Sequence, residues 1–228
     1  MAKRPIFIPA KDSLGVRTLE IEFQWYPGMS VKQKQRSIIE MHRKANEVGY
    51  KEILEISSKS LQPLGIELSA FNLKTTSIQN NFEFTVETAF QSSKIFEKGG
   101  PYRDILIKTS REAKKDPRIR NSGNLIGFRF FGVDFPTTPL TFFYDWLYIN
   151  VLIKNDSLCD KIVEYEAFTD IEFNPEKSIN CQAFSAALFV SMVRNKIDYR
   201  DIRDSKIFSQ ITEDVYKTRA NSYQKKLI

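Results

Sequence analysis

The segment FTVETAFQSSKIF, residues 84–96, says more about this chain than any other stretch of its sequence. It predicts a helix over residues 85–96, with Thr85 as the N-terminal cap. In such a helix Glu87, Gln91 and Lys94 stand at i, i+4 and i+7 and stack along one side. Apolar neighbours bury the segment, and a buried carboxylate, amide and amine are costly unless they pair with each other or with a ligand. The segment therefore predicts a central helix that bears a polar site.

Regular elements are predicted on both sides of this segment. Before it, residues 18–25 alternate polar and apolar side chains like a half-buried strand, and Ser30 with Gln33 begins a helix that Gly49 ends. Further elements are a strand at residues 53–56, a helix from residue 109, a strand over 125–133 and helices over 141–152 and 181–194. The predicted fold class is α+β: a single compact domain, rich in helix, with a few short strands.

Composition along the chain suggests three parts. Residues 1–60 are expected to form a strand-helix-strand extension packed on the core, and residues 61–212 to form the core itself. Residues 213–228 are polar and basic, which predicts a C-terminal tail or frayed helix. No linker is long enough to predict two independent domains.

The charge of the chain favours a polyanionic partner. The 228 residues have a formal net charge of +6 and a hydrophobic content of 42%, with 18 phenylalanines to fill a core. A basic protein attracts an anionic partner, such as nucleic acid or a pyrophosphate ligand, more readily than it attracts a cationic partner. The alternative is that this charge is ordinary for a soluble protein and points to no partner.

Several classes of chemistry lack their residues in this sequence. Cys159 and Cys181 cannot form a disulfide framework, and with His42 as the single histidine no zinc-type spacing occurs. His42 precedes Arg43 and Lys44, so it is interpreted as a surface residue rather than a catalytic base. Neither a dinucleotide fingerprint nor a P-loop is present, and we expect no metal and no cofactor. The absence of an apolar leader or spanning segment predicts a cytoplasmic protein without a membrane partner.

Several blocks of the sequence resemble the NADAR (YbiA-like) family. The segment 85–94 is similar to that family's Glu-His-x-x-Gln-x-x-Lys helix, and the blocks 69–72, 110–114, 144–146 and 168–170 follow the family's order. Thr88 stands where the family usually has His, no Trp-Gly follows Asp170, and residues 1–60 are additional. The whole chain is most similar to the NADAR antitoxins paired with DarT-type ADP-ribosyltransferase toxins, which modify guanine in DNA.

This resemblance implies a NADAR-like fold and an ADP-ribosyl glycohydrolase that removes ADP-ribose from guanine bases of nucleic acid, with DNA as the expected carrier and a cognate ADP-ribosyltransferase toxin as a possible partner. It implies Glu87, Lys94 and Asp170 as catalytic residues. Glu87 would supply a carboxylate at the anomeric carbon, and Asp170 a second one. Lys94 would be an acid, an electrostatic partner or an amine nucleophile.

The resemblance also implies a set of ligand-binding residues. Gln91 would hold a ribose hydroxyl or a base edge, and Arg111 and Lys114 the pyrophosphate, aided by N–H groups of the helix near Ser110. Glycines would allow close backbone approach, and an aromatic side chain would stack on the base. The full set is Phe71, Asn72, Gln91, Gly99, Gly100, Ser110, Arg111, Lys114, Tyr144 and Trp146.

Structural alternatives and other functions remain open at this point. Glu87 and Lys94 could be a buried structural pair, Gly99 and Gly100 a helix stop, and the aromatic residues near 144–148 part of the core. In place of a hydrolase, the chain could be a module that binds ADP-ribose or modified nucleic acid, or neutralises a toxin, without turnover. A weaker alternative is an N-glycosidase for a small metabolite.

Overall fold

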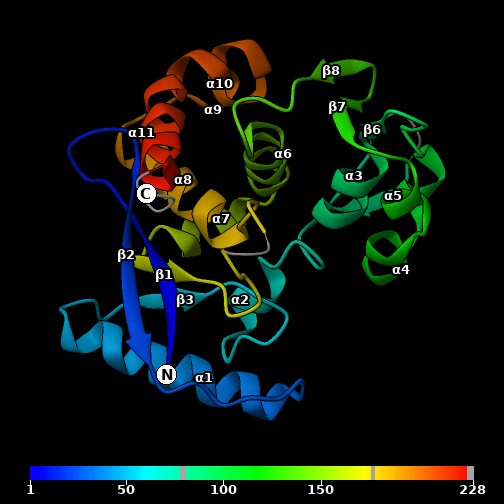
Figure 1. Ribbon diagram of the computed structural model, residues 1–228. Coiled ribbons are helices and arrows are strands. Elements are labelled where there is room, and N and C mark those ends of the chain that lie inside the picture. Colours follow the sequence, from blue (N-terminus) through cyan, green and yellow to red (C-terminus); the bar gives the residue numbers. More distant parts are fainter. Residues whose placement is uncertain (78–80, 176–177, 225–228) are drawn as a thin grey trace.

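A four-stranded sheet in the order β2-β1-β9-β3 lies on the left side of the molecule as drawn in Figure 1. The computed structural model describes residues 1–77, 81–175 and 178–224. Strands β1 (Ala2–Pro9) and β2 (Val16–Phe23) form an antiparallel hairpin, and β9 (Ala167–Thr169) pairs with β1. Strand β3 (Ile53–Glu55) runs parallel to β9, with Glu55 opposite Thr169. The carboxyl ends of these two parallel strands therefore lie together.

Side chains that alternate along the strands fill two cores. Ile6 and Ile8 of β1 face a small cluster with helix α1 (Val31–Glu47), whereas Phe7 between them faces the large cluster. In α1 the Ser30 hydroxyl accepts a hydrogen bond from the N–H of Gln33, as the sequence predicts. One stripe of α1 thus faces the sheet.

Helices α6 (Phe142–Leu152) and α8 (Gln182–Arg194) form the centre of the large core. Both are buried nearly all round, and their residues pack with Leu54 and Phe168 from the other face of the sheet. The sequence predicted both helices within a residue or two of their observed ends. Every helix of the described residues is too short or too polar to cross a membrane.

The C-terminal residues pack on this core instead of leaving it. Helices α9 (Tyr199–Arg203) and α10 (Ser205–Ile211) precede α11 (Glu213–Gln224), in which Val215 and Tyr216 are buried. The guanidinium of Arg219 lies 3.6 Å from the ring centroid of Phe184. Of the predicted tail, residues 213–224 are therefore a docked helix, and 225–228 lie outside the described residues. The division into extension, core and tail stays a prediction.

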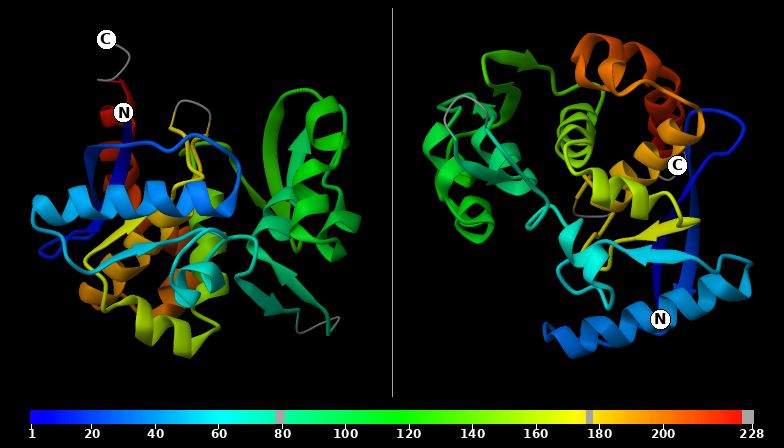
Figure 2. Two further views of the ribbon diagram at one scale, coloured as in Figure 1. Left: turned by 90° about the horizontal axis from the view of Figure 1, so that it is seen from below. Right: turned by 180° about the vertical axis from the view of Figure 1, so that it is seen from behind.

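A second group of elements lies on the opposite side of α6 from the main sheet (Figures 1 and 2). It contains the antiparallel sheet β6-β7-β8 and four short helices, among them α3 and α4, which reappear below. Its members are β6 (Lys94–Phe96), β7 (Leu125–Phe130), β8 (Val133–Phe135), α3 (Val86–Ser92), η1 (Arg103–Ile107), α4 (Ser110–Lys115) and α5 (Arg118–Asn121). Connecting elements are α2 (Pro63–Glu67), β4 (Lys74–Thr76), β5 (Glu83–Thr85) and α7 (Asp156–Ile162).

The predicted helix over residues 85–96 is shorter in the structure. Its cap is as expected, because the Thr85 hydroxyl accepts a hydrogen bond from the N–H of Thr88. The helix ends at Ser92, however, where the hydroxyls of Ser92 and Ser93 donate to the carbonyl of Ala89 and compete with helical bonding. Lys94 then begins strand β6 and lies opposite Phe128 of β7. The prediction that Lys94 is on the helix was wrong.

Candidate active site

A cleft of about 710 Å³ opens beside α3, at the carboxyl ends of the parallel strands β3 and β9. Ligand sites commonly lie at this edge of a parallel pair, because the loops that follow both strands meet there. Most of the predicted site residues line the cleft, namely Phe71, Asn72, Glu87, Gln91, Lys94, Arg111, Lys114, Tyr144 and Asp170.

One wall of the cleft is a hydrogen-bonded line of three side chains. The Gln91 amide nitrogen donates to Glu87 Oε1 at 2.9 Å, and Lys94 Nζ donates to Gln91 Oε1 at 2.8 Å. Glu87 and Gln91 are adjacent on one side of α3, and both are buried. Lys94 reaches Gln91 from β6, so the predicted line exists although its third member is on a strand.

Burial changes the acid–base behaviour of Lys94. Loss of water around the ammonium lowers its pKa from 10.5 to about 8, with Glu87 opposing the change and Lys114 adding to it. Nζ also lies 4.5 Å from the ring centroid of Phe90. A lysine with this pKa can give up a proton near neutral pH, and a fraction of it is the free amine.

Asp170 supplies an acid on another side of the cleft. Its Oδ1 accepts hydrogen bonds from the N–H groups of Glu172 at 3.0 Å and Phe173 at 3.2 Å, which fixes the turn after β9. Burial, and then the nearby charge of Glu55, raises the pKa of the Asp170 carboxyl well above its ordinary value. Among the described residues no lysine or arginine forms an ion pair with it, so the protonated form is favoured.

The phenol of Tyr144, on α6, is close enough to Glu87 and to Asp170 for the charges of both to act on it. Burial raises the pKa of its phenol well above 10, and the charges of Glu87 and Asp170 raise it further. Both carboxyl groups are therefore near the same hydroxyl. The neutral phenol remains a hydrogen-bond donor at the cleft wall.

Arg111 and Lys114 of α4 form a cationic rim. Both side chains are exposed, and neither forms an ion pair with another described residue. Lys114 Nζ lies 5.1 Å from the ring centroid of Phe71, which also lines the cleft. The rim therefore offers positive charge and an aromatic surface to an anionic ligand.

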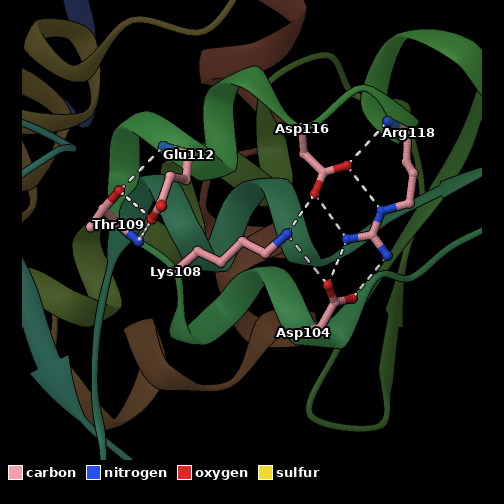
Figure 3. Close-up of polar contacts among 6 residues, drawn as sticks. All are labelled: Asp104, Lys108, Thr109, Glu112, Asp116 and Arg118. Atoms are coloured by element: carbon pink, nitrogen blue, oxygen red, sulfur yellow. Dashed lines mark hydrogen bonds and ion pairs between the residues drawn. The ribbon is translucent and has the colours of Figure 1, made fainter.

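A network of charges holds α4 in place (Figure 3). Thr109 caps the helix, and its own N–H and hydroxyl donate to the Glu112 carboxylate. At the other end Asp116 accepts from Lys108 at 2.8 Å and from Arg118, which also binds Asp104. These contacts anchor both ends of the short helix that presents Arg111 and Lys114.

Four of the predicted ligand residues lie outside the cleft lining: Gly99, Gly100, Ser110 and Trp146. The indole of Trp146 packs on Phe135, with ring centroids 4.8 Å apart. Ser110 uses its hydroxyl to donate to the carbonyl of Phe71 at 2.9 Å. We therefore withdraw these four residues as direct ligands. Trp146 packs against the hydrophobic core, which was the structural alternative for this residue.

The glycines act on the site through the backbone. Gly100 has φ of +91°, and a Cβ there would lie 2.3 Å from the carbonyl oxygen of Lys94. The close approach supports β6 from behind, because only glycine accepts both the conformation and the contact. Gly99 immediately precedes Gly100, and its carbonyl accepts a hydrogen bond from the N–H of Phe96 at 2.7 Å.

Sequence reasoning missed several cleft residues. Ser57, Lys59 and Gln182 line the cleft, and Gln182 accepts from the N–H of Ala70 and donates to the carbonyl of Ile56, both at 2.7 Å. Gln182 also donates a hydrogen bond to Asp170. The sequence signal for these residues was the pair Ser57 and Ser58 directly after the strand at residues 53–56. This pair indicates a ligand site only once β3 is known to run parallel to β9, because the loops after both strands then meet.

His42 was interpreted as a surface residue, and the structure corrects this. Its Nε2 lies 2.9 Å from the Thr169 hydroxyl oxygen, and burial lowers its pKa to about 4. In the described part of the chain no group of three His, Cys, Asp or Glu side chains could hold a metal ion.

Comparison with protein families identifies the chain. The model of the DarT1-associated NADAR antitoxin matches residues 2–222. The chain belongs to this family. The match includes β1, β2 and α1 as well as the cleft, so the residues that seemed additional to a NADAR domain are part of this family's own pattern. No curated protein matches the chain.

Proposed function

We propose that this NADAR antitoxin is an ADP-ribosyl glycohydrolase that removes ADP-ribose from guanine bases of nucleic acid, in particular DNA. Membership in the DarT1-associated antitoxins supports a role opposite a DarT1-type toxin. The observation that supports hydrolysis is a single cleft in which a buried acid without a cationic partner, Asp170, accompanies the line Glu87, Gln91 and Lys94. Perturbed acids and amines that share a cleft are typical of catalytic sites.

The reaction requires one proton donor and one proton acceptor. When the bond between the anomeric carbon and the guanine nitrogen breaks, its electron pair leaves with the base and an oxocarbenium-like sugar remains. Asp170 in its protonated form gives its proton to that nitrogen. Water then adds to the anomeric carbon, and Glu87 takes the proton that the water loses. Exchange with solvent restores both carboxyl groups.

Gln91 and Lys94 support the reaction by positioning Glu87 and by supplying charge or an amine. Gln91 holds the Glu87 carboxylate in place with a hydrogen bond and is itself held by Lys94. Lys94 adds positive charge beside Glu87. Alternatively, its free amine attacks the anomeric carbon as guanine leaves with the proton from Asp170. One nitrogen proton then passes through Glu87 to the ring oxygen as the ring C–O bond breaks, and water hydrolyses the resulting protonated Schiff base to free ADP-ribose and the amine. Its lowered pKa is compatible with both roles.

The rim suits the pyrophosphate of ADP-ribose. Arg111 and Lys114 have no carboxylate partner among the described residues, so their charge is available to the two phosphates. The cleft volume of about 710 Å³ falls in the range that ordinary ligand sites occupy. The nucleic-acid strand that carries the guanine then remains outside the cleft, next to the ribose from which the guanine is cleaved.

The test is release of ADP-ribose from a guanine-ADP-ribosylated DNA oligonucleotide, followed by chromatography. We expect Glu87→Gln to slow release by about 100-fold. Glu83→Gln is the matched control, because Glu83 is exposed and pairs with Lys74 at 2.7 Å outside the cleft. Equal rates for wild type and Glu87→Gln would refute the catalytic assignment.

Two further outcomes separate the alternatives. Tight binding of the modified oligonucleotide without release would identify a binding module. Cleavage of small N-glycosides with no action on the oligonucleotide would identify a small-molecule N-glycosidase. The same oligonucleotide made of RNA tests the choice of carrier, because a DNA-directed enzyme should act on it more slowly.

A further inference from the structure

A second buried carboxyl group, that of Glu55, lies behind the floor of the cleft. Glu55 ends β3, and only 2% of the residue is exposed. It does not line the cleft, but the hydroxyl of Ser57, which does, hydrogen-bonds to it. A buried carboxyl is costly, and among the described residues no lysine or arginine forms an ion pair with this one. Its presence therefore needs a reason.

The hydrogen bonds of Glu55 bracket Asp170. Glu55 Oε2 accepts from the Thr169 hydroxyl at 2.6 Å, and Oε1 accepts from the N–H of Ile171 at 2.8 Å. Thr169 and Ile171 are the residues immediately before and after Asp170. Burial raises the pKa of Glu55, but the hydrogen bonds from Ile171, Thr169 and Ser57 act in the opposite direction. Both oxygens of Glu55 are thus acceptors, which is the arrangement of an ionised carboxylate.

His42 completes this arrangement without adding charge. The single proton of the Thr169 hydroxyl goes to Glu55, so Thr169 must accept from His42 Nε2 at 2.9 Å. That requires the tautomer with the proton on Nε2. Because burial lowers the pKa of His42 to about 4, the ring is neutral near pH 7 and does not offset the charge of Glu55.

The other groups around Asp170 do not supply a cation either. Glu172 of the same turn is paired with Lys34 of α1 at 3.2 Å. From α6 come the phenols of Tyr144 and Tyr148, and from the start of α8 the Cys181 thiol, all with pKa values raised by burial and by Asp170. Gln182 is neutral. Among the charged groups that act on Asp170, Glu55 therefore raises its pKa the most.

We propose that Glu55 is a positioning residue that fixes the turn around Asp170 and, by its negative charge, keeps the proton on that acid. The inference rests on the proposed function, because it gives Asp170 the proton that the departing guanine needs. Oδ1 of Asp170 already accepts two backbone N–H groups, and Gln182 donates a third hydrogen bond to the carboxyl, so the proton belongs on Oδ2. One carboxylate behind the floor thus sets the protonation state of another at the cleft surface.

The first experiment compares pH profiles of ADP-ribose release for wild type, Glu55→Gln and the exposed control Glu52→Gln. Glutamine has no charge, and its single oxygen can accept from Thr169 or from Ile171 but not from both. Without the negative charge, Asp170 should lose its proton at lower pH. The kcat of Glu55→Gln should fall about tenfold for each unit by which the pKa of Asp170 drops, at pH values above that new pKa. The loss should shrink as the pH is lowered, with KM unchanged.

A merely structural role predicts a different pattern. Damage to the turn would reduce kcat by the same factor at every pH and would raise KM. That result, or a wild-type profile for Glu55→Gln, overturns the proposal. Thermal unfolding of each variant reports whether it is folded when assayed.

A second measurement holds even where Glu55→Gln does not fold. Infrared spectra of the wild-type protein at neutral pH should contain a band of a protonated carboxyl group that is missing in Asp170→Asn. The absence of that band contradicts the role of Glu55. Since the measurement needs no turnover, it is independent of the ADP-ribose assay, whose failure would instead contradict the proposed function.

Discussion

Two networks of charged side chains, one around the short helix α4 and one at the ends of strands β3 and β9, differ in how their charges are balanced. In the network of Figure 3, Asp104 and Asp116 meet Lys108 and Arg118, with contacts of 2.6 and 2.8 Å from Arg118 to the two carboxylates. Hydrogen bonds from Arg118 hold the pKa of Asp116 well below its usual range. In the cleft, Asp170 and Glu55 have no cationic partner among the described residues, and burial raises the pKa of both.

The difference separates structural from reactive charge. Paired charges such as those of Asp116 and Arg118 are stabilised in the native state, so their protonation is fixed near neutral pH. Unpaired buried groups such as Asp170 and Lys94 lie closer to their titration points and can exchange protons with a substrate. The comparison predicts that substitutions in the cleft reduce activity more than stability, whereas substitutions in the network of Figure 3 reduce stability more than activity.

The largest expected effect is that of Lys94→Met. We expect ADP-ribose release to fall at least about 100-fold, because the substitution removes the amine and its bond to Gln91. Stability should change in the other direction. Since burial lowers the pKa of Lys94 from 10.5 to about 8, the native protein binds fewer protons than the unfolded chain within that window, and wild-type stability rises with pH there.

Lys94→Met should therefore be more stable than wild type at pH 7, by about 1–2 kcal/mol. The gain should shrink as the pH rises from about 8 and should vanish above 10.5, where the lysine is neutral in both states. Denaturant unfolding at pH 7 and 10 measures this. A variant that is less stable at pH 7 would show that Lys94 is a structural cation like Arg118. Borohydride reduction of wild type with substrate, followed by mass spectrometry, tests the Schiff base.

An intermediate effect is expected at the rim. Arg111→Ala and Lys114→Ala should each raise KM about tenfold with little change in kcat, because they remove charge from the ligand and not from the reacting atoms. The loss should be smaller at high salt, which screens exposed charges. Lys115→Ala is the control, since Lys115 is exposed on the same helix but does not line the cleft. Equal KM values for all three variants would remove the rim from the binding site.

The smallest effect on turnover is expected in the network of Figure 3. Asp116→Asn should lower the free energy of unfolding by about 1 kcal/mol, a modest value because Lys108 and Arg118 remain partly in water. The kcat and KM of the folded variant should stay within about twofold of wild type. Thermal unfolding and the ADP-ribose assay check both statements. A large fall in kcat would mean that the position of α4 controls the chemistry.

Local signals in the sequence predicted much of the fold. The caps at Ser30 and Thr85 and the ends of α6 and α8 were predicted because capping and hydrophobic spacing act over a few residues. The same signals failed at Lys94. A helix and a strand compete there, and the pairing of Lys94 with Phe128 of β7, thirty or more residues away, decides for the strand.

For the site, the sequence determined which groups are available: one acid and one amide on α3, a lysine just after it, an aspartate in a turn and two cations on a later helix. Only the tertiary structure decided that Glu55 and His42 lie behind Asp170, and that Trp146 and Ser110 serve the core and the backbone. The physical reason is that burial and pKa shifts depend on which distant segments pair, and here the parallel pairing of β3 with β9 brings Glu55 to Asp170.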